Sequence, residues 1–186
     1  DKLVPFKVLE GKLKGSELTG IRYEQLIPWF NPGEGAFKVI PGDYVTTEDG
    51  TGIVHIAPTF GADDAKVARL AGVPGLQVVD RNGDLQAQVD LRGRFFRVEE
   101  LDPDYAAANM SPDYAEWAGR YVKNAYDSEL PEDAPTLDVD ICVMLKQQNK
   151  AFRIEKHTHN YPHCWRTDKP VLYYPLNSWF IRTTAV

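Results

Sequence analysis

Short apolar or alternating segments follow one another through the first third of the chain. Clusters such as Asn31-Pro32-Gly33 separate them, and the segments span residues 3–8, 21–27, 37–40 and 51–56. Alternation with a period of two is typical of half-buried strands, and clusters of Gly, Pro and Asn are typical of turns. Strands at this short spacing predict a mainly β fold that closes like a barrel and carries peripheral helices, rather than a parallel α/β fold.

The stretch from Gly50 to Gly72 predicts a strand, a tight loop and a short helix. Because side chains alternate along a strand, Thr51 and His55 share one face, and the opposite face is apolar. Pro58 has no N–H to donate, so the strand is expected to end before it. The helix is expected over residues 62–71, with Gly72 as the C′ residue that ends it.

The middle of the chain predicts a hairpin followed by a helical insertion. Residues 76–79 and 85–89 flank the pair Asn82-Gly83. Asn-Gly is a strong hairpin signal because both residues accept positive φ. The insertion is expected at about residues 103–150, where the spacing of apolar residues changes from strand-like to helical.

Two elements are expected inside this insertion. A helix begins at Ser111-Pro112, where a hydroxyl can cap it and proline suits the first helical position. Apolar residues then recur at helical spacing as far as Ala125, and we interpret this stripe as core packing. The second element has two interpretations, either a helix capped by Asp138 or a buried strand over residues 139–145.

Composition places the chain among ordinary globular domains. It has 186 residues, of which 43% are hydrophobic and 26% charged, and this suits one domain with its own core. We expect a single domain fragment over residues 1–186, with an extended return segment at about 165–186. Two cysteines, and no apolar run of the ~20 residues that span a bilayer, predict a reduced, cytoplasmic chain without a membrane partner.

The net charge is −6, whereas proteins that bind RNA are ordinarily basic. Bulk charge therefore argues against a nucleic-acid partner, although two local clusters of basic residues could contact phosphates. Solvated surface and phosphate contact are equally good interpretations of these clusters. Their members are Arg92, Arg94 and Arg97, and Lys146, Lys150, Arg153 and Lys156.

Two carboxylates, Asp63 and Asp64, stand at the start of the helix expected over residues 62–71. The unpaired N–H groups and partial positive charge of a helix N-terminus stabilise an ionised carboxylate. Such a group is a weak base but a good anchor for the ammonium group of a ligand, with His55 opposite in an apolar loop. The alternative is structural, with an aspartate that caps the helix and a histidine satisfied in the core.

Three of the four histidines lie in one extended stretch beside a cysteine. Alternation would place His157, His159 and His163 on one side, with Cys164 next to them. Three such ligands with an open position would suit a catalytic zinc ion. Against zinc, metal ligands usually come from separate elements, and the chain has no second pair of cysteines.

Motifs in four parts of the chain carry a resemblance that covers nearly all of it. They are Gly-Thr-Gly-Ile-Val-His-Ile-Ala-Pro-Thr-Phe-Gly-Ala-Asp-Asp at 50–64, Val-Asp-Arg-Asn-Gly at 79–83, Tyr-Pro-His-Cys-Trp-Arg at 161–166, and Pro-Val-Leu-Tyr-Tyr with Ser-Trp-Phe-Ile at 170–181. In this order they resemble the editing domain of isoleucyl-tRNA synthetase, a class I aminoacyl-tRNA synthetase.

The resemblance implies a closed, β-barrel-like editing domain of the valyl-, isoleucyl- and leucyl-tRNA synthetase type. Its implied activity is hydrolysis of valine misattached to the isoleucine tRNA, with valyl-adenylate open as a second substrate. The implied partners are the tRNA acceptor end that carries the misattached amino acid and the parent catalytic core. Editing would need no cofactor, since ATP and Mg²⁺ belong to that core. A valyl- or leucyl-specific editing domain is the near alternative.

The resemblance also implies roles for individual residues. The matching carboxylate holds the α-ammonium group of the substrate, and the matching histidine lines the pocket near the terminal ribose and the scissile ester. An aromatic residue lies near the terminal adenosine, and the remaining positions shape the pocket wall. In that order these residues are Asp64 and His55 as the catalytic pair, Tyr161, and then Thr51, Gly52 and Phe60.

Two departures from the family pattern matter. Thr167 stands where many members have a second cysteine, so half of a structural zinc site is broken and we predict no metal. The threonine-rich segment that completes the family's pocket is expected upstream, so the chain is expected to be a fragment. A non-catalytic module that binds RNA ends or the parent core therefore stays open as a second class of function.

Overall fold

The computed structural model describes residues 7, 10–48, 50–131, 134–156, 158–179 and 181–184. Most of these residues lie in loops and turns. The regular elements are α1 (Ala62–Leu70), β1 (Gln77–Val79), β2 (Leu85–Ala87), α2 (Pro103–Asn109) and α3 (Leu137–Gln147). Short 3₁₀ helices occupy Gly15–Leu18, Val98–Glu100, Pro112–Glu116 and Asn124–Tyr126.

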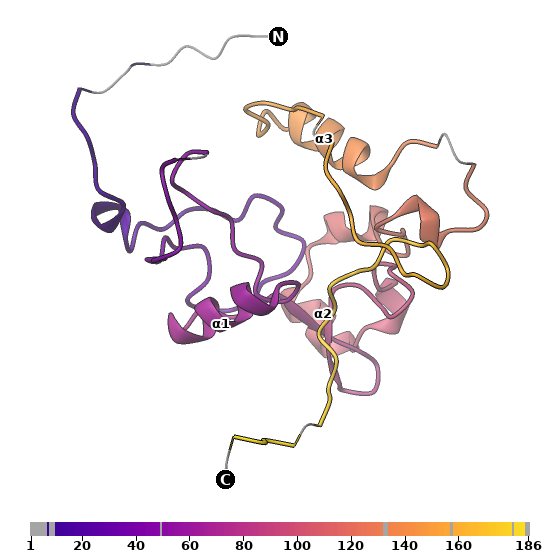
Figure 1. Cartoon of the computed structure of the whole chain (residues 1–186). Helices are drawn as coiled ribbons and strands as arrows, with labels where there is room; N and C mark the ends of the chain where they lie inside the picture. The colour runs from indigo at the N-terminus through magenta and orange to yellow at the C-terminus, as the bar shows by residue number, and fades with distance from the viewer. Residues whose placement is uncertain are drawn as a thin grey trace.

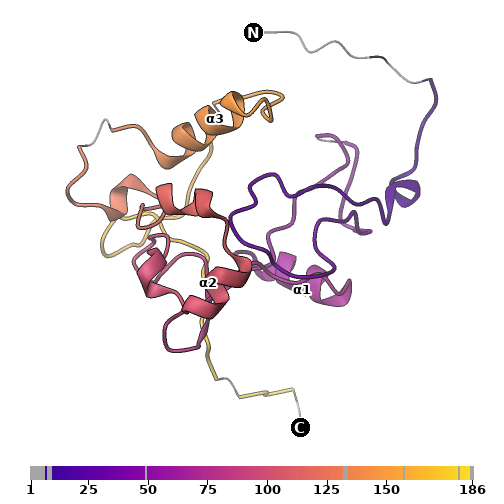
Figure 2. The ribbon, with the colours of Figure 1, turned by 180° about the vertical axis from the view of Figure 1, so that it is seen from behind.

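Two groups of elements lie side by side, as opposite views of the ribbon show (Figure 1 and Figure 2). α1 lies among the loops of the first sixty residues, whereas α2 and α3 belong to the other group. The C-terminal segment joins the two groups. Tyr174 in this segment contacts the ring of Phe60 on one side and the carbonyl of Val89 on the other.

The expected closed β-barrel is wrong, and the fold is not mainly β. In the described ranges the one sheet is the antiparallel pair β1–β2, which does not close. Residues 21–27 and 37–40 form no strand, although Arg22 and Lys38 make a single antiparallel bridge. Alternation marks an apolar face, but a strand also needs a partner for its backbone N–H and C=O groups. That pairing extends for too few residues here to build a sheet.

The expected strand at residues 51–56 is also wrong. The chain turns at Thr51 and then runs as a loop. Val54, on the face predicted to be apolar, keeps 55% of its surface exposed, and Ile56 on the same face is only half-buried, so that face is not packed into a core. The remaining expected strand, at residues 3–8, lies outside the described residues apart from Lys7.

The predicted hairpin is confirmed. β1 and β2 pair with Gln77 opposite Ala87 and with Val79 opposite Leu85. The carboxylate of Asp80 accepts the N–H groups of Asn82 and Asp84 and thereby closes the turn. Only Gly83 in this turn has positive φ, at +83°. The turn is therefore a type I turn with a glycine bulge rather than a turn with two positive-φ residues.

The predicted first helix is confirmed, with its C-terminal signal. α1 ends in a Schellman motif, in which the N–H of Val73 donates to the carbonyl of Ala68 and that of Gly72 donates to Arg69. Gly72 adopts φ +63°, a conformation that L side chains rarely adopt. The glycine therefore ends the helix as its position predicted.

The helical insertion is partly as predicted. Ser111 caps a helix with proline at its first position, but this helix is a 3₁₀ helix that ends at Glu116. Of the two interpretations of the later segment, the helix is confirmed as α3, although Thr136 rather than Asp138 occupies the N-cap position. The helix α2 was not predicted, and its N-cap is Asp102.

A single aromatic cluster forms the centre of the core, as the stripe after Ser111 predicted. Tyr114 is completely buried and Trp117 nearly so. Both rings pack against Trp29, with centroids 6.0 and 5.1 Å away. The hydroxyl of Tyr114 donates a hydrogen bond to the carbonyl of Phe96. A buried hydroxyl without such a partner would be costly, so this bond fixes the position of the ring.

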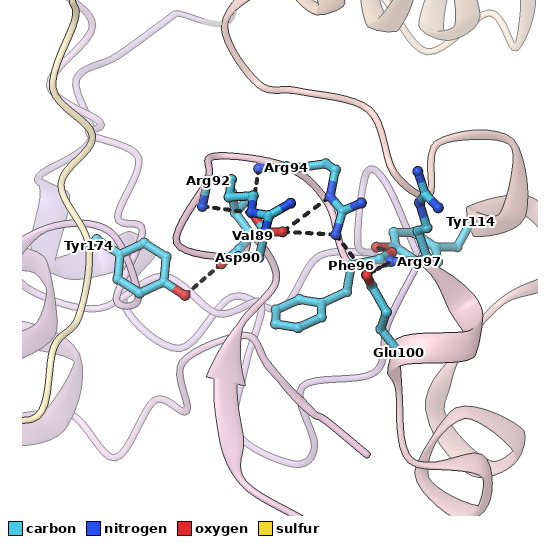
Figure 3. Close-up of polar contacts among 9 residues, drawn as sticks. All are labelled: Val89, Asp90, Arg92, Arg94, Phe96, Arg97, Glu100, Tyr114 and Tyr174. Carbon is cyan, nitrogen blue, oxygen red and sulfur yellow. Dashed lines mark hydrogen bonds and ion pairs between the residues drawn. The ribbon is translucent and has the colours of Figure 1, made fainter. Parts of the chain in front are cut away.

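An ion-pair network borders this core (Figure 3). The guanidinium of Arg94 binds the carboxylates of Asp90 at 3.0 Å and Glu100 at 2.8 Å. Burial alone would raise the pKa of Glu100, but hydrogen bonds from the Arg97 N–H and the Arg94 guanidinium outweigh it and lower the pKa. Arg94 therefore has a structural role, so the basic cluster with Arg92 and Arg97 is not a simple solvated face.

The lowered pKa of Glu100 predicts a dependence of stability on pH. Folding favours the ionised carboxylate, so its stabilisation is complete above the unfolded pKa of about 4.3 and is lost as the pH falls through the lower folded value. We expect Glu100→Gln to flatten the loss of unfolding free energy between about pH 5 and pH 3 in urea titrations. Glu99→Gln is the matched control, because Glu99 is exposed. Equal slopes for the two variants would contradict the assignment.

Gly93 provides a second test of packing. It is buried at φ +77°, and a Cβ there would overlap the ring of Tyr126. Gly83 has a similar φ of +83° but open space around it. Ala at either position pays about 1–2 kcal/mol for the left-handed backbone. Gly93→Ala should cost about 1–3 kcal/mol more than Gly83→Ala in urea unfolding, because only Gly93 adds overpacking.

Candidate functional site

The loop before α1 is held by the carboxylate of Asp64. Its Oδ2 accepts the backbone N–H of Ala57 at 2.8 Å, and the bond crosses the whole turn between them. Asp64 is half-buried in the first turn of α1. Its position at the helix N-terminus is as the sequence predicted.

This carboxylate does not cap the helix in the usual way. The N-cap residue is Gly61, and it makes no side-chain cap bond. A Cβ at Gly61 would lie 3.0 Å from Cγ and Oδ2 of Asp64. The glycine therefore leaves room for the carboxylate to fold back over the turn and reach Ala57. Asp63, its neighbour, is exposed.

A threonine attaches the same loop to the start of the hairpin. Thr59 Oγ1 donates to the carbonyl of Leu76 at 2.8 Å. A Cβ at Gly75 would lie 3.0 Å from that hydroxyl oxygen. Because glycine has no side chain, the loop at Thr59 can approach the segment that leads into the hairpin. Asp64 and Thr59 together give the turn two fixed points.

The predicted partners of Asp64 at residues 51–55 lie in an exposed loop. His55 and Thr51 are exposed, and Thr51 Oγ1 accepts the N–H of Ile53 at 3.3 Å. Gly52 adopts φ +73°, and a Cβ there would lie 3.1 Å from Cγ2 of Thr47. In the part of the chain that the structure describes, no hydrogen bond or ion pair joins His55 to Asp64. The structure therefore fixes Asp64 but does not attach His55 to it, and His55 is not a buried core histidine.

Phe60 lies on the inner side of the turn. It packs against the core, and its ring makes an edge contact with Tyr174, with centroids 6.5 Å apart. The Tyr174 hydroxyl donates to the carbonyl of Val89 at 2.7 Å (Figure 3). Burial, and then the charge of Asp90, raise the pKa of Tyr174, so this hydroxyl stays protonated as the donor.

A small hollow lies behind the turn. Its volume is about 220 Å³, and Pro58, Thr59, Ala65 and Ala68 line it together with Pro175 of the C-terminal segment. None of the six predicted site residues lines this hollow. The predicted residues at 51–64 therefore surround a turn rather than enclose one cavity.

Tyr161 lies at a different hollow, of about 340 Å³, which Lys123, Thr158, His159, His163 and Pro170 also line. The ammonium of Lys123 lies 4.6 Å from the centre of the Tyr161 ring. The structure thus separates the predicted site residues into the turn before α1 and this second hollow, and shows no contact between the two among the described residues.

The histidine-rich stretch shows no metal geometry where it is described. No group of three His, Cys, Asp or Glu side chains outside the masked positions could hold a metal ion. His157 of the zinc hypothesis lies outside the described residues. Cys164 belongs to a tight loop, and hydrogen bonds from the Thr167 side chain and the N–H groups of Arg166 and Thr167 lower the pKa of its thiol. The prediction that no metal binds stays a prediction.

The sequence was compared with family models and with known proteins. No protein-family model matches it. It is 66% identical over its whole length to a segment of the isoleucine–tRNA ligase of Bacteroides fragilis and covers 16% of that protein. The chain corresponds to a segment of isoleucine–tRNA ligase. Ligases of Porphyromonas gingivalis and Thermoplasma volcanium are 66% and 40% identical over 99% and 97% of the chain, which covers 16% and 14% of them.

The chain therefore spans about one sixth of the length of the ligases that it matches. The predicted family is confirmed at the level of isoleucine–tRNA ligase. None of the helices in the described ranges of this ligase segment has the length and apolar character needed to cross a membrane.

Two residues of the ligase segment support the turn without having been predicted to do so. The motif at 50–64 assigns no role to Thr59, and the motif at 170–181 marks Tyr174 only as part of a return segment. A tyrosine in an apolar stretch signals a hydroxyl that needs a partner when it is buried. That signal could have marked Tyr174, but not its partner Val89, which is 85 residues away.

Proposed function

We propose that this segment of isoleucine–tRNA ligase hydrolyses valine from mischarged isoleucine tRNA, with Asp64 as the anchor for the amino group of valine. The observation that carries the proposal is the placement of the Asp64 carboxylate. One of its oxygens is bound to Ala57 N–H, at the N-terminus of a helix. In the described residues the other oxygen has no hydrogen bond, so it can accept an ammonium group.

The need for such a site follows from the chemistry of the two amino acids. Valine and isoleucine differ by one methylene, which a hydrophobic pocket can discriminate by only about 1–3 kcal/mol, and this class of ligase is itself the usual example of that limit. A second site that hydrolyses the smaller product supplies the missing accuracy. Hydrolysis at that site needs selection by size and a fixed ammonium anchor.

The chain's residues divide this work between them. Asp64 would hold the α-ammonium group by a charge-assisted hydrogen bond, which orients the ester. His55, exposed on the preceding loop, would approach the terminal ribose, and Thr51, Gly52 and Phe60 would limit the size of the side chain. Water would be the nucleophile, since Asp64 at a helix N-terminus is a weak base. Tyr161 would contact the RNA end.

The proposal also defines partners and cofactors. The partners are the acceptor end of a mischarged tRNA and the catalytic core of the ligase, in the cytoplasm. Hydrolysis requires no cofactor in this segment, and ATP and Mg²⁺ would act in the core. A non-catalytic module that binds RNA ends is the second candidate, because the predicted residues line no common hollow.

Substitution of Asp64 tests the proposal in a full-length ligase that carries this segment. Asn can still accept the N–H of Ala57 but lacks the charge, so the turn should survive while the ammonium anchor is lost. A charge-assisted hydrogen bond contributes about 1.5–3 kcal/mol, so we expect valyl-tRNA deacylation to fall about 10- to 100-fold. Isoleucine charging should not change.

The matched control is Asp63→Asn, which removes the same charge from the neighbouring exposed position. It should deacylate valyl-tRNA at the unmodified rate. Equal losses for both variants, or an equal loss of charging and deacylation in Asp64→Asn, would contradict the anchor. Selective release of valine by the isolated chain, assayed with valyl- and isoleucyl-tRNA, would exclude the non-catalytic module, because such a module releases neither amino acid.

A further inference from the structure

The hollow that contains Tyr161 has a chemistry different from that of the turn before α1. It lies where residues 158–170 pass the 3₁₀ helix at Asn124–Tyr126. Among the described residues, its lining includes one lysine and two histidines and no aspartate or glutamate. In a chain with a net charge of −6, a hollow whose described lining contains no carboxylate favours an anionic ligand over a cationic one.

Lys123 supplies the positive charge. Its ammonium lies over the Tyr161 ring at 4.6 Å from the centroid, and this cation–π contact holds a long, flexible side chain at the hollow. In the described part of the chain, Lys123 makes no ion pair with a carboxylate. An incoming phosphate would therefore not have to displace an internal anion.

His163 supplies a hydrogen-bond acceptor of known orientation. Its Nδ1 lies 2.8 Å from the carbonyl oxygen of Tyr161. A carbonyl can only accept, so Nδ1 carries the proton, and in the neutral ring Nε2 is left as an acceptor. Nε2 has no hydrogen-bond partner among the described residues. Nε2 can therefore accept a hydrogen bond from a hydroxyl group of a ligand.

The backbone around the hollow is fixed on both sides. His163 and Pro170 form an antiparallel bridge, and the N–H of Val171 donates to the carbonyl of Pro162 at 3.0 Å. The hydroxyl of Tyr126 donates to the carbonyl of Pro170 at 2.8 Å. These bonds hold the two segments together, so Lys123 and His163 face the same hollow before any ligand binds.

We propose that this hollow binds one ribose phosphate of an RNA strand, with Lys123 paired to the phosphate and His163 Nε2 accepting the ribose 2′-hydroxyl. Tyr161 orients Lys123 and forms the apolar wall against the sugar. The 2′-hydroxyl is the group by which a protein distinguishes RNA from DNA at a given site. The inference rests on the proposed function only in taking RNA as the ligand, and it requires no hydrolysis.

The test measures binding of a fluorescent single-stranded RNA hexamer, and of a DNA hexamer of matching sequence, to the 186-residue chain. We expect RNA to bind more tightly than DNA. Lys123→Gln should weaken both and reduce the slope of log K against log salt by about 0.7, the value for one contact to a single strand. Lys123→Arg retains the charge and should retain the slope. Lys66→Gln, at an exposed position of α1, should change neither.

His163→Phe tests the hydroxyl contact separately. It retains a ring but removes the acceptor, so RNA affinity should fall about fivefold, to that of DNA, while DNA affinity stays the same. Equal effects of Lys123→Gln and Lys66→Gln would overturn the proposal, as would equal binding of RNA and DNA by the unmodified chain. Displacement of the RNA by equimolar adenosine monophosphate would assign the hollow to free nucleotides instead.

The outcome is distinguishable from that of the hydrolysis test. If Asp64→Asn leaves valyl-tRNA deacylation unchanged, the hydrolytic assignment fails and the oligonucleotide results still stand. If the hexamer binds without dependence on Lys123 and His163, this inference fails, whatever the deacylation rate is.

Discussion

The burial of Tyr114 is the constraint on which the rest of the fold depends. The side chain is fully buried, so its hydroxyl needs an internal partner, and it finds the carbonyl of Phe96. That bond fixes the backbone at Phe96, two residues after Arg94. Trp29 packs on the same ring, and the backbone beside it bonds to Ser111 and Asn109. A loop from the first third of the chain is thereby attached to the insertion.

Outside this core, no continuous sheet fixes the loops among the described residues. Single polar bonds fix them instead. The turn before α1 depends on Asp64 and Thr59, and the C-terminal segment depends on Tyr126 and Tyr174. Each of these bonds joins residues distant from one another or closes a turn. A bond of this kind contributes about 1 kcal/mol net, so each loop can be altered with little effect on the aromatic core. Such loops can carry binding residues while the core carries stability.

Local signals in the sequence predicted local structure correctly. Gly72 predicted the end of α1, Asn82-Gly83 predicted the hairpin, and Ser111-Pro112 predicted a helix start. The same reasoning could have found α2, because Asp102-Pro103 is also an N-cap followed by proline. These signals succeed because the chemistry of a cap or turn lies within four or five residues.

The prediction of a closed barrel failed because strand pairing is not a local property of the sequence. Alternation at residues 21–27 and 51–56 identified apolar faces, but it carries no information on which segment pairs with which. The same distinction between local and long-range features applies to the candidate site. The position of Asp64 at a helix N-terminus follows from neighbouring residues, whereas the approach of Lys123 to Tyr161 joins residues 38 positions apart by number. No pattern within a short window contains that contact.

The geometry of Asp64 reconciles the two interpretations of that residue, structural and functional. A cap and an anchor compete only if both use the same oxygen. Oδ2 is used by Ala57, and the room for this bond comes from Gly61, whose missing side chain lets the carboxylate fold back. The bond to Ala57 fixes the direction of the carboxylate at the N-terminus of α1. In the proposed function, this structural bond would leave the second oxygen of Asp64 in one orientation toward an ammonium group.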